Sequence, residues 1–218
     1  MISGVDEAGR GPVLGPLVVA GVTFKDDKKL IEYKIRDSKK ISPNRREILA
    51  KKIKELAIRY EILVISAVDI DDMRKVMTLN EIEVNAFNKV IKKLRPDICY
   101  VDSADVNEDR FAKDISIGLS FKPNIISKHK ADDIYPIVGA ASILAKTKRD
   151  ELVKVIEEKL KQKLNLPLGS GYPADPITKK FLKTYLNKFG KLPPHTRHSW
   201  KTSQNLIDEI KNKKLDDY

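Results

Sequence analysis

Two adjacent acidic residues, Asp6 and Glu7, follow a short apolar stretch near the N-terminus and precede a glycine-containing turn. A third acid, Asp102, follows a second apolar stretch, and Asp132 and Asp133 precede a long helical pattern. Neighbouring residues of a strand point to opposite faces, so Asp6 and Glu7 can share one site only if their strand ends there. If the two strands are neighbours with the same ends aligned, the carboxylates converge; otherwise they are ordinary solvated acids.

A cluster of three or four carboxylates provides hard oxygen ligands. With no cysteine cluster and only three histidines in the chain, such a set suits Mg²⁺ or Mn²⁺ better than zinc. The cluster is electrostatically unfavourable without cations, because like charges repel one another. Two divalent ions about 3.5–4 Å apart are the usual arrangement for in-line displacement at phosphate. The acids therefore favour metal-dependent chemistry on a phosphate ester.

The positive charge of the chain is concentrated in two segments. Lys and Arg outnumber Asp and Glu by 42 to 31, which gives a net charge of +11. Residues 25–60 carry a net +7 and residues 176–218 a net +6, whereas the remainder is close to neutral. Clustered basic residues are typical of proteins that bind a phosphate backbone, although a lysine-rich soluble surface would look similar. Beside an acidic metal site, the two basic segments fit a nuclease.

Strands and helices alternate along the chain, which indicates the α/β class. Ser42-Pro43 has the composition of a helix start, and Thr78-Leu79-Asn80-Glu81 has the spacing of a capping box. Arg95-Pro96 should end the helix that the capping box begins. The expected strands cover residues 2–5, 12–24, 60–68, 98–101 and 124–127, and the expected helices cover residues 43–59, 79–94, 135–164, 178–189 and 199–211.

Length and composition exclude several classes of protein. A chain of 218 residues with 41% apolar residues can bury one sizeable core with a small appendage, and is not disordered. The Pro- and Gly-dense stretch 166–176 predicts a boundary between a domain over 1–175 and a basic helical segment over 176–218. A single cysteine, Cys99, allows no internal disulfide and suggests the cytoplasm. No export signal or run of about 18 apolar residues is evident, so no membrane association is expected.

Six blocks of sequence together resemble one protein family, the type 2 ribonucleases H, or ribonuclease HII, and its archaeal members in particular. The blocks occur in the family's order and span residues 1–175, about four fifths of the chain. They are Asp6-Glu7-Ala8-Gly9-Arg10-Gly11-Pro12, Asp37-Ser38-Lys39-Lys40, Val101-Asp102-Ser103, His129-Lys130-Ala131-Asp132, the segment 138–146, and Gly169-Ser170-Gly171-Tyr172-Pro173-Ala174-Asp175.

The resemblance implies a ribonuclease-H-like fold, a mixed β-sheet flanked by helices, and an endonuclease. Its substrates would be RNA/DNA hybrids and duplex DNA that contains ribonucleotides, and its products would carry a 5′-phosphate and a 3′-OH. Such an enzyme would serve DNA replication and repair. The family's catalytic metal ligands fall on Asp6, Glu7, Asp102 and Asp132. They would bind two Mg²⁺ or Mn²⁺ ions, one activating water and the other stabilising the leaving oxygen.

The same resemblance implies a set of substrate-binding residues. The family's Gly-Arg-Gly element falls on Gly9, Arg10 and Gly11, whose backbone would grip the ribose 2′-OH and a flanking phosphate. Tyr172 would lie against the sugar at the junction of ribonucleotide and deoxyribonucleotide, where the 2′-OH distinguishes the two. Lysines and an asparagine would lie near substrate phosphates: Lys39, Lys40, Lys146 and Asn80.

Two other readings remain open at this point. The chain could be a metal-dependent DNA nuclease of the ribonuclease-H-like fold, or a basic hybrid-binding module without catalysis. A reader of the 2′-OH argues against the first and four intact acids argue against the second. Gln204-Asn205-Leu206-Ile207 begins like a sliding-clamp peptide, but Ile210 and Lys211 replace the aromatic pair, so clamp binding is not predicted. A monomer is expected.

Overall fold

The computed structural model describes residues 1–33, 35 and 41–216. The chain forms two compact units. The first contains Met1–Ala8, Val18–Val64 and Met77–Lys148, and the second contains Gly9–Leu17, Ile65–Val76 and Arg149–Tyr218. This division does not coincide with the boundary expected at residue 175, because helix α7 (Pro136–Lys161) continues from the first unit into the second.

A five-stranded sheet with the order β3-β2-β1-β4-β5 is the basis of the first unit. Strand β1 runs antiparallel to β2 and parallel to β4, and β4 runs parallel to β5, so the sheet is mixed. The mixed sheet flanked by helices is therefore confirmed. The strands are β1 (Ile2–Ala8), β2 (Leu17–Phe24), β3 (Arg59–Ile65), β4 (Ile98–Asp102) and β5 (Asn124–Lys128).

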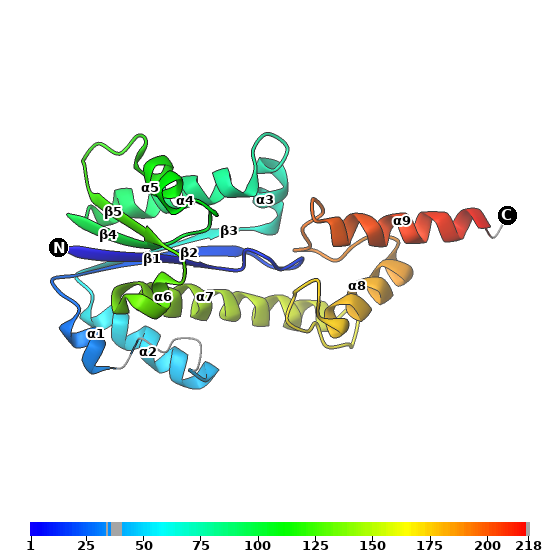
Figure 1. Ribbon diagram of the computed structural model, residues 1–218. Coiled ribbons are helices and arrows are strands. Elements are labelled where there is room, and N and C mark those ends of the chain that lie inside the picture. The colour runs from blue at the N-terminus through cyan, green and yellow to red at the C-terminus, as the bar shows by residue number, and fades with distance from the viewer. Residues whose placement is uncertain (34, 36–40, 217–218) are drawn as a thin grey trace. The chain divides into compact units, whose positions relative to one another are not determined.

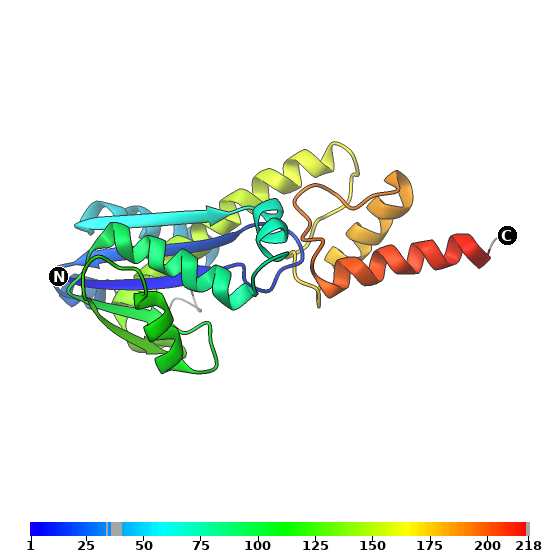
Figure 2. The ribbon, with the colours of Figure 1, turned by 90° about the horizontal axis from the view of Figure 1, so that it is seen from above.

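Helices cover both faces of this sheet (Figures 1 and 2). Helices α4 and α5 lie on one face, and α1, α2, α6 and the first part of α7 lie on the other. A Cβ added to Gly4 of β1 would lie 2.3 Å from the carbonyl oxygen of Ile137, so the backbone of α7 packs directly on the strand. These helices are α1 (Lys28–Glu32), α2 (Pro43–Leu56), α4 (Leu79–Leu94), α5 (Glu108–Ser116) and α6 (Ala131–Ile134).

Local sequence signals set several helix ends. Ser42 caps α2 by accepting a hydrogen bond from the backbone N–H of Arg45, and Thr78 forms the expected capping box with Glu81. The strand expected over 60–68 is shorter, because a second capping box between Ser66 and Asp69 begins helix α3 (Ala67–Met73). Helix α3 was not expected, since its first residues continue the β-branched pattern of the strand.

The second unit contains α3, the last part of α7, and the helices α8 (Pro176–Phe189) and α9 (Lys201–Asp216). An apolar cluster joins α7 to α8, with Leu160, Phe181 and Tyr185 among its buried members. Asp71 of α3 accepts hydrogen bonds from the backbone N–H groups of His198 and Ser199, just before α9 begins. The two expected C-terminal helices are thus confirmed. No helix in the described part of the chain is long and apolar enough to cross a membrane.

Candidate active site

The register of β1 and β4 places two of the candidate acids at the same end of the sheet. Val5 of β1 pairs with Val101 of β4 in parallel, so Asp6 and Asp102 each follow at the same level. Parallel neighbours end at the same edge of a sheet, which brings side chains after the paired segment close together. The alignment on which the predicted carboxylate cluster depends is therefore present.

A third acid joins them from the short helix α6. The backbone N–H of Ala131 donates a hydrogen bond of 2.6 Å to Oδ1 of Asp102, which ties the start of α6 to the end of β4. Asp132, the next residue, is 3% exposed. Nζ of Lys146 on α7 lies 3.6 Å from Oδ2 of Asp132. One lysine thus supplies positive charge beside the acids.

Asp6 is 4% exposed and carries the clearest electrostatic signature of the site. The pKa of its carboxyl is raised to about 7, chiefly by burial and next by the negative charge of Asp102, with a smaller contribution from Asp132. The hydroxyl of Ser142 and the ammonium of Lys146 act in the opposite direction. A carboxyl with a pKa near neutrality, surrounded by other acids, is typical of a functional site. A bound cation would relieve the same repulsion.

The residue types at this edge fit a hard divalent cation, because Asp6, Asp102 and Asp132 provide oxygen ligands. Burial and the neighbouring acids both disfavour the ionised form of Asp6, and a cation would offset this cost. Throughout residues 1–33, 35 and 41–216, however, no three acidic, histidine or cysteine side chains are close enough together to hold an ion as they stand. The site therefore has suitable chemistry and alignment, and its carboxylates would have to draw together around an ion.

Glu7 is the fourth predicted ligand, and it follows Asp6 on the same strand. Strand β1 continues through Glu7 to Ala8, paired with β2. Successive side chains therefore leave the strand on opposite faces, so Asp6 and Glu7 point apart at their Cβ atoms. The condition stated from the sequence, that the strand ends between them, is not met. The side chain of Glu7 is longer than that of Asp6. Its carboxylate could therefore reach the edge of the sheet beyond Val5 and Val101, where the pairing of β1 with β4 ends.

The predicted substrate-binding turn, Gly9 to Gly11, lies in the second unit and is held by the side chains of Arg197 and Trp200, which both precede α9. Arg197 is fully buried and donates from Nη2 to the carbonyl oxygen of Gly9 at 2.5 Å and from Nη1 to that of Arg10 at 2.8 Å. Nε1 of Trp200 donates to the carbonyl oxygen of Gly11 at 3.3 Å. All three carbonyl groups of the turn therefore face the C-terminal segment.

This arrangement fixes the direction of the backbone donors in the turn. In a trans peptide the N–H points opposite to the C=O of the same unit, and the structure describes no cis peptide. The N–H groups of Arg10 and Gly11 therefore point away from Arg197 and Trp200. Two adjacent backbone donors that face away from the protein segment behind them can bind an anionic or hydroxyl oxygen.

Glycine is required at position 9 of this turn and not at position 11. Gly9 has a φ of +92°, and a Cβ there would lie 2.4 Å from the carbonyl oxygen of Pro16. At Gly11 a Cβ would lie 3.5 Å from the ring of Tyr172, an ordinary contact distance. Tyr172 is thus beside the turn, and its side chain is 43% exposed. The turn and the tyrosine form one surface in the second unit.

The other candidate residues are placed differently. Nδ2 of Asn80 donates a hydrogen bond of 3.4 Å to Oδ2 of Asp105, so the amide group of Asn80 contacts the loop after β4. Lys39 and Lys40 lie outside the described residues.

Arg197 was not singled out from the sequence, because nothing local distinguishes a buried arginine among ten basic residues of the C-terminal segment. Its hydrogen bonds to residues more than 180 positions away depend on the fold.

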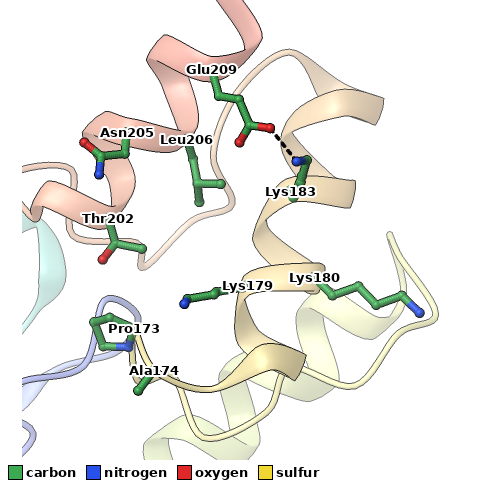
Figure 3. Close-up of a pocket in the computed structure, with 9 residues that line it drawn as sticks. All are labelled: Pro173, Ala174, Lys179, Lys180, Lys183, Thr202, Asn205, Leu206 and Glu209. Atoms are coloured by element: carbon green, nitrogen blue, oxygen red, sulfur yellow. Dashed lines mark hydrogen bonds and ion pairs between the residues drawn. The ribbon is translucent and has the colours of Figure 1, made fainter.

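A basic groove of about 680 Å³ lies between α8 and α9 in the second unit (Figure 3). Lys179, Lys180 and Lys183 contribute to it from α8, and Lys183 forms an ion pair with Glu209 of α9. Figure 3 shows Lys179 extending toward Thr202 and Pro173, away from that ion pair. The groove thus presents positive charge that the acid of α9 balances only in part.

Comparison with known proteins gives a consistent result. The family model described as ribonuclease HII matches residues 3–203. A ribonuclease HII from Methanococcoides burtonii is 46% identical, over 94% of this chain and 99% of the relative. The structure is similar to ribonuclease H2 from Pyrococcus horikoshii, with a TM-score of 0.87, 40% identity, and 96% and 98% of the two chains covered. It is also similar to a ribonuclease HII from Archaeoglobus fulgidus that was solved in complex with PCNA, with a TM-score of 0.85, 41% identity, and coverage of 94% and 96%.

Proposed function

Because the chain belongs to the ribonuclease HII family and is therefore an endoribonuclease of the ribonuclease H type, we propose that it also cuts duplex DNA at embedded ribonucleotides. Cleavage falls on the 5′ side of the ribonucleotide and leaves a 3′-OH upstream and a 5′-phosphate on the ribonucleotide. The substrate-binding surface around Gly9 to Gly11 supports this reading, because an enzyme that cuts DNA alone has no use for donors directed at a 2′-OH.

The four acids Asp6, Glu7, Asp102 and Asp132 hold Mg²⁺ or Mn²⁺ in this proposal. Held by these carboxylates, divalent cations would supply activation of a water for attack on the phosphorus and stabilisation of the leaving 3′ oxygen. Asp6 and Asp132 are buried, and Lys146 balances part of the charge of the acids before a substrate phosphate arrives. No histidine is needed as a base.

The turn and Tyr172 recognise the sugar in this proposal. The N–H groups of Arg10 and Gly11, directed by the hydrogen bonds on their partner carbonyls, bind the 2′-OH and the adjoining phosphate. The exposed ring of Tyr172 packs against the sugar that follows. Gly9 follows Glu7 by two residues in the chain, so the same short segment supplies residues for metal binding and for sugar recognition.

The C-terminal segment 176–218 holds the duplex outside the catalytic residues of 1–175. The lysines of the groove between α8 and α9 support this role, because clustered positive charge attracts a phosphate backbone. Lys39, Lys40 and Asn80 remain candidate phosphate contacts. We propose a cytoplasmic monomer, consistent with a single cysteine, Cys99, that is buried and free.

The alignment of Asp6 with Asp102 and the attachment of Asp132 beside them carry the catalytic part of the proposal. Its test is the pair Asp132→Asn and Asp133→Asn, two isosteric changes at neighbouring positions of α6. We expect Asp132→Asn to abolish Mg²⁺-dependent cleavage, whereas Asp133→Asn, exposed at the start of the helix, retains it. Equal activity in the two variants would contradict the ligand assignment, and cutting of an all-DNA duplex by the wild type would favour a DNA nuclease.

A further inference from the structure

Arg149, in the part of α7 that belongs to the second unit, is a buried arginine beside the predicted sugar-reading surface. It is 8% exposed. Its Nη2 donates to the carbonyl oxygen of Ser170 at 3.2 Å, and its guanidinium carbon lies 5.5 Å from the centre of the Tyr172 ring. This distance is in the range of a cation–π contact. Arg149 therefore contacts both the ring and the backbone two residues before it.

The same side chain also packs against the glycine turn. A Cβ added to Gly9 would lie 3.0 Å from Cδ and Nε of Arg149, and one added to Gly171 would lie 3.6 Å from its Nη2. Gly9 and Gly171 are both in the left-handed region, where the backbone is set by its surroundings. One arginine thus supports the turn, the loop before Tyr172 and the Tyr172 ring.

Stability alone does not account for an arginine at this position. Nε of Arg149 is buried and has no hydrogen-bond partner among the described residues. The ion pair of Nη1 with Asp150 is 3.5 Å long, and the Asp150 side chain is 41% exposed. Burying a charge with few partners is unfavourable, and an apolar side chain of similar length would often be at least as stable. A role in function explains why a guanidinium lies there.

We propose that Arg149 is a positioning residue that holds the Tyr172 ring and the adjoining turn in the arrangement that reads an RNA–DNA junction. It acts through Tyr172 and does not contact the substrate. This inference rests on the proposed function, since it assigns to Arg149 the orientation of a ring whose role at the sugar is itself proposed.

The experiment compares Arg149→Met, which keeps the unbranched aliphatic part of the side chain and removes its charge, with Lys159→Met, which removes an exposed charge from the same helix. Single-turnover cleavage is measured on a DNA duplex with one ribonucleotide and on a long RNA/DNA hybrid, and the ratio of the two rates is reported. We expect Arg149→Met to keep its melting temperature and to lower the ratio roughly tenfold, because a misplaced contact affects the substrate that has only one 2′-OH. Lys159→Met should leave the ratio unchanged.

Two further measurements separate the possible failures. In a Tyr172→Ala background, adding Arg149→Met should not lower the ratio again, and the ring signals of Tyr172 in an NMR spectrum should shift in Arg149→Met. Equal losses on both substrates with a lower melting temperature, additive losses in the double variant, or unchanged Tyr172 signals would each overturn the inference. If Tyr172→Ala itself leaves the ratio unchanged, the proposed role of Tyr172 fails, and the inference fails with it.

Discussion

At the scale of single residues, Asp6 combines burial with two neighbouring acids, and the cost of ionising it in the fold should be measurable. Its pKa is raised to about 7 from an ordinary value of 3.8, so folding favours the protonated form. Below about pH 4, the Asp6 carboxyl is protonated in both the folded and the unfolded state, so it does not affect the stability of the wild type. The stability decreases as the pH rises from there through about 7.

We accordingly predict that Asp6→Asn abolishes cleavage and stabilises the metal-free protein at pH 8. The gain in the free energy of unfolding should be on the order of 2–4 kcal/mol, since each pKa unit corresponds to about 1.4 kcal/mol. Urea unfolding in the presence of a chelator at pH 4, 6 and 8 measures it, and the difference between variant and wild type should increase along that series. A variant less stable than the wild type at pH 8 would contradict the electrostatic account.

The two glycines of the turn should respond differently to the same substitution. Gly9→Ala forces a left-handed residue to carry a Cβ 2.4 Å from a backbone oxygen, whereas the Cβ of Gly11→Ala meets only the Tyr172 ring at 3.5 Å. We expect Gly9→Ala to lower the free energy of unfolding by about 2 kcal/mol or more and to lose most activity. Gly11→Ala should stay within about 1 kcal/mol of the wild type and impair mainly the cleavage of single ribonucleotides. Equal destabilisation of the two variants in thermal unfolding would show that the turn can relax.

At the scale of elements, the segment before α9 should stabilise the turn through Arg197. Replacing it by Met leaves the carbonyl oxygens of Gly9, Arg10 and Gly15 without their buried donor. We predict a loss of about 3–5 kcal/mol in unfolding free energy, as expected when buried partners lose a charged donor. Guanidinium unfolding measures the loss, and Lys201→Met, an exposed charge at the start of α9, is the control. An Arg197→Met protein as stable as that control would mean that water replaces these bonds.

The elements differ in how far the sequence alone defines them. Helix α4 has its capping box at Thr78 and its end before Pro96, and both of its expected ends are confirmed. Helix α6 has four residues and an N-cap in the left-handed region, so it has too little periodicity to detect. Helix α5 begins at a capping Asn107, a signal that was present but not used. Helix ends that are set by local capping residues, as in α4, could be predicted from the sequence, whereas an element that depends on packing, such as α6, could not.

The candidate site shows the same limit. The end of β4 at Asp102 follows from an apolar run and a polar stop, and its neighbour β1 was recognisable in the same way. The parallel register between them joins residues 96 positions apart and comes only from the sheet. Arg149 and Arg197 were missed for this reason, because burial of a charged residue among distant partners leaves no local pattern.

At the scale of the whole molecule, the two basic segments predict a salt-dependent contact with nucleic acid. Lys179 is exposed in the groove between α8 and α9. We predict that Lys179→Gln, in an inactive Asp132→Asn background, weakens hybrid binding and reduces the slope of log K against log salt by about 0.9, the value for one lost phosphate contact. Lys191→Gln, an exposed charge outside the groove, serves as the control in fluorescence anisotropy titrations. An equal reduction in both variants would indicate a diffuse attraction.

One cleavage experiment tests both the carboxylate cluster and the 2′-OH reader that we propose for this enzyme. Wild type and Asp6→Asn are incubated with Mg²⁺ and a labelled DNA duplex that holds one ribonucleotide, beside an all-DNA duplex, and the ends are mapped. We predict a single cut on the 5′ side of the ribonucleotide with a 3′-OH upstream, no cut in DNA alone, and no cleavage by Asp6→Asn. Cutting of the all-DNA duplex, or normal turnover by Asp6→Asn, would contradict it.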